Sequence, residues 1–73
     1  MSIQIDLKGP DGNAYALLGY AKSWGKQVMM HEDVIKDITT RMTSGDYNNL
    51  LKVFHEEFST VMEFVNAPKD LRL

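Results

Sequence analysis

The feature that most constrains the fold is the junction between residues 3–7 and the segment that follows them. Apolar and polar residues alternate over IQIDL, which predicts a strand with one buried face. The turn-forming residues GPDGN come next and end the strand. From Asn13 to about Val28, apolar residues recur every three or four positions. The sequence therefore predicts a strand joined by a tight turn to an amphipathic helix, with Asp11 or Asn13 as the N-cap.

Two more helices and a second strand are predicted downstream. Residues 31–42 have carboxylates, Glu32 and Asp33, in the first turn, which suits a helix N-terminus, and continue with an apolar stripe. Gly45 suits the left-handed position that ends such a helix. A third helix is predicted over residues 47–58, capped by Asp46 or Ser44. Residues 60–65 are rich in β-forming side chains.

These elements predict an α+β domain of order β-α-α-α-β. We expect three helices packed on a two-stranded antiparallel sheet, because two strands alone are marginal in water. The expected core covers residues 3–66, and residues 67–73 are expected to form a loose tail onto which Leu71 and Leu73 could dock. The outer edges of such a sheet stay open, which invites a partner strand.

Size and composition limit this domain further. Seventy-three residues without cysteine make one small domain, with neither a disulfide nor a thiolate–metal site to stabilise it. Oligomerisation is the remaining common route to additional burial, so a homo-oligomer is expected. The chain shows no signal peptide and no apolar run near the ~20 residues of a membrane span. We expect a cytoplasmic protein, and the net charge of −2 argues against nucleic-acid binding.

The turn from Gly9 to Asn13 is the one segment whose backbone amides are candidates for binding an anion, because helix N-termini bind phosphates. It lacks the lysine and the hydroxyl residue of a phosphate-binding P-loop, and Asp11 would repel an anion. We therefore interpret it as a capped turn. The alternative is a small nucleic-acid- or nucleotide-binding protein that uses this turn with Lys8, Lys22 and Lys26.

No pattern in the chain indicates a metal site, a cofactor or catalysis. The motifs His31-Glu32-Asp33 and His55-Glu56-Glu57 lack the paired spacing of helical metal ligands, although the two histidines could meet across a helix pair. No serine has an adjacent base. Asp33 and Asp37 lie at the helical spacing typical of solvated carboxylates. We expect no enzyme.

Two segments, IDLKGPDGNAYALLGYAK and MTSGDYNNLLKVF, resemble a small family of uncharacterised proteins that are mostly encoded by bacteriophages. The resemblance covers residues 3–65. It implies a small cytoplasmic protein made during infection, which binds a host or phage macromolecule. It implies no particular activity and no particular site residues.

The leading hypothesis is a non-enzymatic interaction module that binds a host or phage protein, modulating that protein or a defence system. Acidic surfaces can occupy sites meant for nucleic acid or for basic protein patches. Tyrosines that leave the core stripe are candidates for an interface. The candidate contact residues are Glu32, Asp33, Asp37, Glu56, Glu57, Tyr15 and Tyr20. A third possibility is a purely structural subunit, which would form a defined oligomer without a cellular partner.

Overall fold

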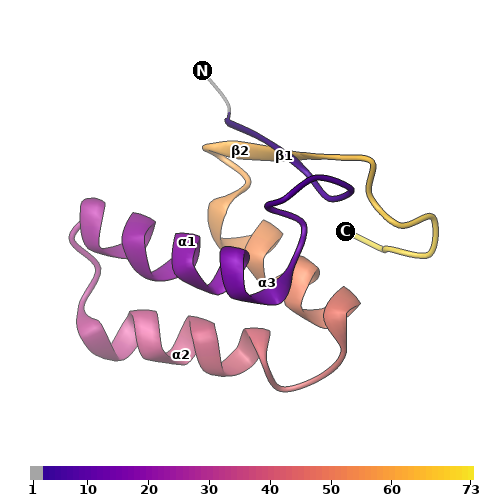
Figure 1. The fold of residues 1–73 in the computed structure, drawn as a ribbon. Coiled ribbons are helices and arrows are strands. Elements are labelled where there is room, and N and C mark those ends of the chain that lie inside the picture. Colours follow the sequence, from indigo (N-terminus) through magenta and orange to yellow (C-terminus); the bar gives the residue numbers. More distant parts are fainter. Residues whose placement is uncertain (1–2) are drawn as a thin grey trace.

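A computed structural model describes residues 3–73, which form three helices and a two-stranded sheet (Figure 1). The predicted order β-α-α-α-β is confirmed. In chain order the elements are β1 (Ile3–Asp6), α1 (Ala14–Gln27), α2 (Glu32–Met42), α3 (Tyr47–Phe58) and β2 (Met62–Val65).

The two strands are parallel, so the predicted antiparallel sheet is wrong. Ile3 lies opposite Met62, and Asp6 lies opposite Val65. The reason is visible in Figure 1, where each connection between successive elements reverses the direction of the chain. Five elements have an even number of such connections, so β2 must run the same way as β1.

The core lies between the inner face of the sheet and the helices. In Figure 1 the sheet lies beside α1 and α3, and α2 lies on the far side of this pair. Ile5 and Met62 bring the two strands into the core, where both are buried. Phe54 on α3 is fully buried, and its ring stacks against Phe64 at 6.0 Å and packs against Trp24 at 5.6 Å. One aromatic cluster therefore joins strand, first helix and third helix.

The outer face of the sheet is largely polar, with Gln4 and Asp6 on β1 and Glu63 beside Val65 on β2. Gln4 donates a hydrogen bond to Glu63 across the strands at 2.9 Å, and both residues are exposed. Each strand has a single neighbour in the sheet. The open sheet edges predicted from the sequence are therefore present in the described part of the chain.

The helix starts follow the sequence more closely than the helix ends do. Asn13 is the N-cap of α1 and Asp46 is the N-cap of α3, and each was one of the two residues predicted for its position. The prediction for Gly45 is wrong, because no glycine in residues 3–73 has a positive φ. Instead, the hydroxyls of Thr43 and Ser44 donate to the last carbonyls of α2, with Ser44 Oγ 2.7 Å from Arg41 O.

Residues 67–73, the expected tail, are attached to the domain through Asp70 and Leu71. Asn48 donates a hydrogen bond to Asp70 at 2.9 Å, and the half-buried Leu71 packs against the core. Leu73 stays exposed. Of the two leucines considered for docking, Leu71 is therefore the one that docks.

Candidate functional site

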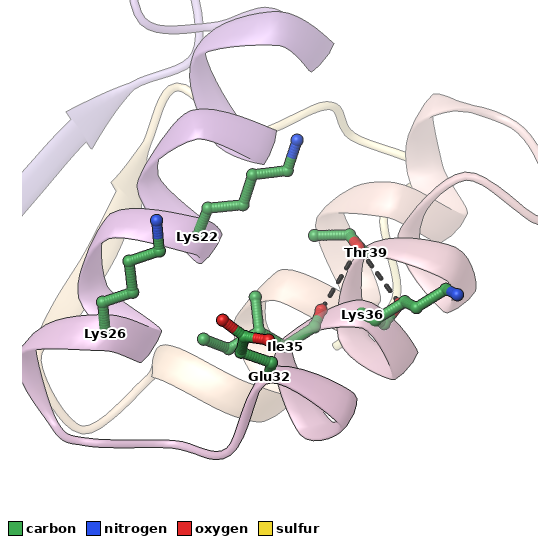
Figure 2. Close-up of a pocket in the computed structure, with 6 residues that line it drawn as sticks. All are labelled: Lys22, Lys26, Glu32, Ile35, Lys36 and Thr39. Carbon is green, nitrogen blue, oxygen red and sulfur yellow. Dashed lines mark hydrogen bonds between the residues drawn. The ribbon is translucent and has the colours of Figure 1, made fainter.

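A groove between α1 and α2 gathers most of the free positive charge on the helical layer. It has a volume of about 380 Å³, and Figure 2 shows the six residues that line it. They are Lys22, Lys26, Glu32, Ile35, Lys36 and Thr39.

The sequence builds this groove from both helices. Lys22 and Lys26 are four residues apart, which places them on one face of α1. Gly25 is buried beside them, and a Cβ at this position would lie 2.8 Å from Ile35 Cγ1. The missing side chain therefore lets α1 and α2 approach closely. Ile35, buried at 8% exposure, forms the apolar floor.

The lysines of the groove are not neutralised. In residues 3–73 no ion pair within 4.0 Å involves Lys22, Lys26 or Lys36. Glu32 is the single carboxylate lining the groove, so the lining carries three positive charges and one negative charge, a net +2. The Thr39 hydroxyl is already occupied, because it donates to the carbonyls of Ile35 and Lys36 at 3.2 and 3.1 Å (Figure 2).

Two of the predicted acidic contact residues are paired with one arginine. Arg41 Nε donates to Asp37 at 3.0 Å, and its Nη2 donates to Glu57 at 2.7 Å. Hydrogen bonds to Glu57 and then to Asp37 raise the pKa of the Arg41 guanidinium. The Glu57 pair therefore links α2 to α3, the Asp37 pair lies within α2, and the charge of both carboxylates is partly compensated.

The other three acidic residues do not join them. Glu32 lines the lysine groove. Asp33 belongs to the first turn of α2, where its backbone N–H donates to Nδ1 of the N-cap His31 at 3.1 Å. Glu56 is exposed on α3. The five carboxylates thus have different surroundings, with Asp37 and Glu57 paired to Arg41 and the other three outside those pairs.

The two predicted tyrosines have different surroundings. Tyr15 is 89% exposed and lies seven residues before Lys22, on the same face of α1. Tyr20 is half-buried and stacks on Trp24 at 5.1 Å. Hydrogen bonding to Asp11 raises the pKa of the Tyr20 phenol. Tyr15 is therefore the freer of the two for contact with a partner.

The turn lies apart from Lys22 and Lys26, two of the three lysines of the alternative hypothesis. Asn13 closes the turn, since its side chain donates to Pro10 O at 2.8 Å and accepts from Ala16 N–H at 2.9 Å. At about 1.5 Å per helical residue, Lys22 lies roughly 14 Å along α1 from Asn13. Lys8 lines a different hollow. Lys22 and Lys26 instead join Lys36, which the sequence reasoning did not include.

The histidines have separate partners. His55 packs against Phe64 with ring centroids 6.2 Å apart, whereas His31 caps α2. In residues 3–73 no group of three or more His, Asp or Glu side chains is arranged to hold a metal ion. No helix in this range is both long and apolar enough to cross a membrane.

Comparisons with protein-family models, with curated proteins and with solved structures gave no match to this chain.

Proposed function

We propose that this protein is a non-enzymatic interaction module that binds another protein through the groove between α1 and α2. The observation that carries the proposal is the gathering of three unpaired lysines around an apolar floor. Unpaired charge at a partly apolar surface favours a partner of opposite charge, which gains both ion pairs and apolar burial. The exposed Tyr15 extends this surface along α1.

The occupant that fits best is an amphipathic acidic helix. The groove runs between two helices, and a third helix can lie along such a groove with its apolar face inward. Apolar side chains would contact Ile35, and flanking Asp or Glu side chains would reach Lys22, Lys26 and Lys36. Glu32 would oppose a carboxylate at one end, which favours one register over the others.

The resemblance to phage-encoded proteins makes a host protein the expected partner, and modulation of that protein or of a defence system the expected outcome. This part of the proposal rests on the resemblance alone. A homo-oligomer built on the open sheet edges is compatible with it, because the edges and the groove are formed by different elements.

The binding test uses a synthetic helical peptide with leucines on one face and glutamates beside them. Wild-type protein should bind it, as measured by fluorescence anisotropy, and a lysine-for-glutamate version of the peptide should not bind. The double variant Lys22→Glu/Lys36→Glu should bind at least about tenfold more weakly, because two attractions become repulsions. The matched control Lys52→Glu changes an exposed lysine outside the groove and should bind normally.

Equal binding by the wild type and the groove double variant would remove the groove from the proposal. Glu56→Lys tests the acidic residues separately, since Glu56 is exposed and has no ion-pair partner within residues 3–73. If the wild type binds the lysine version of the peptide and Glu56→Lys does not, the contact surface lies on α3 instead.

The lysine groove also supports a second candidate function, the binding of single-stranded nucleic acid. Three lysines would release counterions on contact with phosphates, giving a slope of about −2 for log K against log salt. Titration with oligothymidine at several salt concentrations measures this slope. Tight, steeply salt-dependent binding that Lys36→Glu abolishes would favour this function over the acidic-helix proposal, and no binding at low salt would eliminate it.

A further inference from the structure

An apolar hollow lies at the end of the sheet where both strands begin. The strands are parallel, so Ile3, the first residue of β1, and Val61, which directly precedes β2, lie at the same end. The end of α1 closes the hollow, which has a volume of about 290 Å³. The five lining residues are Ile3, Trp24, Gln27, Val28 and Val61, and none of these five is charged.

Three apolar side chains around this hollow remain exposed to solvent. The exposed fraction is 50% for Ile3, 62% for Val28 and 41% for Val61. One exposed apolar residue is ordinary, but several around one hollow form a patch of the kind that marks an interaction site. A charged occupant would lose hydration here without gaining an ion pair. The hollow therefore favours an apolar, uncharged occupant.

Met29 supplies the second, independent observation. It directly follows Val28 and is 90% exposed, the largest exposed fraction among the large apolar residues in residues 3–73. Its φ of 61° lies in the left-handed region, which strains a residue with a side chain and does not strain glycine. Strain at an exposed apolar residue points to a use of its side chain outside the fold. An apolar side chain therefore projects into solvent directly beside an apolar hollow.

We propose that two copies of this chain form a symmetric dimer in which Met29 of each copy enters the apolar hollow of the other. A two-fold axis brings the same patch of both copies together, so the projection and the hollow must be neighbours on one surface. Met29 meets this requirement, because the residue before it, Val28, lines the hollow. The unbranched thioether of methionine adapts to irregular gaps and makes favourable contacts with aromatic rings such as that of Trp24.

A second copy also supplies what a domain of this size lacks. A chain of 73 residues without cysteine buries a small core, and dimerisation adds apolar burial. One projecting side chain from each copy makes a contact at the small end of protein interfaces, so we expect a weak dimer that depends on concentration. The hollow and the α1–α2 groove share no lining residue, so the dimer does not depend on the proposed binding of an acidic helix.

The test is sedimentation velocity of the full chain at concentrations from about 5 to about 500 µM, the range in which weak dimers form. Wild-type protein should shift from monomer to dimer across this range, and its melting temperature should rise with concentration. A wild type that stays monomeric throughout would overturn the proposal. Growth beyond the dimer would also overturn it, because a two-fold contact closes after two copies.

Met29→Gly separates dimerisation from folding, because it removes the projection and relieves the strained backbone. In dilute protein we expect it to keep or raise the melting temperature. The dissociation constant of the dimer should rise at least about tenfold, since two buried methionine side chains are lost from each dimer.

Two further variants test where the contact lies. Val28→Lys should also weaken the dimer, because it places a charge in an apolar contact while suiting the C-terminal end of α1. The control Tyr15→Lys changes a residue that is 89% exposed and lies roughly 20 Å along α1 from Val28, so it should dimerise like the wild type. An unchanged dissociation constant in Met29→Gly, or equal weakening in Tyr15→Lys, would overturn the proposal.

Discussion

Replacing Gly12 with alanine tests whether close backbone contact shapes the turn between β1 and α1. An alanine Cβ would lie 2.1 Å from Leu7 O and 2.5 Å from Leu7 C, whereas real Cβ atoms essentially never approach within 3.0 Å. The obstructing atoms belong to the backbone, so no side-chain rotation relieves the clash. The turn must open by about 0.9 Å, the difference between 3.0 and 2.1 Å.

That opening strains the hydrogen bonds around the turn. Gly12 N–H donates to Gly9 O at 3.1 Å, and Leu7 N–H donates to Val65 O at 2.9 Å. Overpacking costs about 1–3 kcal/mol and a weakened hydrogen bond about 0.5–1.5 kcal/mol, so we expect a loss of about 2–4 kcal/mol. At about 0.05–0.15 kcal/mol per residue, the whole 73-residue domain has only about 4–11 kcal/mol of unfolding free energy.

Thermal unfolding followed by circular dichroism measures the effect. Gly12→Ala should lower the melting temperature by about 10 °C or more, since 1 kcal/mol corresponds to about 4–8 °C in a domain of this size. Gly19→Ala is the matched control. A Cβ at Gly19 meets nothing within 4 Å, and the change removes a glycine from a helix interior, which should add about 0.5–1 kcal/mol. A Gly12→Ala protein with the same melting temperature as the wild type would refute the reasoning.

The remaining predictions concern an acid-sensitive contact, an ion-pair network and the core. Hydrogen bonds from the Asn66 side chain and the Lys8 backbone lower the pKa of Asp6 below 3.8 in the folded state. The ionised Asp6 side chain therefore stabilises the fold fully well above pH 3.8, and this stabilisation is lost as the pH falls through the pKa that Asp6 has in the folded state. Urea unfolding should therefore show a gap between wild type and Asp6→Asn that narrows below about pH 4, and a constant gap down to pH 2 would contradict this. Arg41→Gln should lower the unfolding free energy by about 0.5–2 kcal/mol in the same assay, because the Arg41 ion pairs are solvent-accessible. A loss above about 4 kcal/mol would contradict the solvent accessibility of these ion pairs. Phe54→Ala empties a fully buried site and should cost about 3–5 kcal/mol of unfolding free energy. A urea unfolding transition close to that of the wild type would be inconsistent with this core.

Element order and type could be predicted from the sequence because they depend on local patterns. Alternation over residues 3–7 and helical spacing after Asn13 each identify one element, and the caps mark where the helices begin. The direction of β2 depends on how many times the chain reverses, and an alternating strand has the same pattern in either direction. Residue patterns alone therefore do not determine the parallel pairing. The number of chain reversals between the two strands, which is four, does indicate it.

Glycine positions show the same limit. The sequence suggested glycines for left-handed backbone, yet the positive φ values in residues 3–73 belong to Met29 and Asn66. Met29 ends α1 in the geometry that usually takes glycine, with Met30 N–H donating to Gly25 O at 2.9 Å. Gly12 and Gly25 are instead needed where another part of the chain comes too close for a Cβ. Such approaches arise from tertiary packing, which leaves no local signature in the sequence.

The candidate site departs from the sequence reasoning for an electrostatic reason. The net charge of −2 argues against nucleic-acid binding, but a sum over the chain hides how charges are placed. Arg41 compensates Asp37 and Glu57, while the three groove lysines keep their charge. A region of net +2 therefore exists on a protein that is acidic overall. Because screening in 0.15 M salt acts over about 8 Å, a bound partner responds mainly to this local region and not to the total charge.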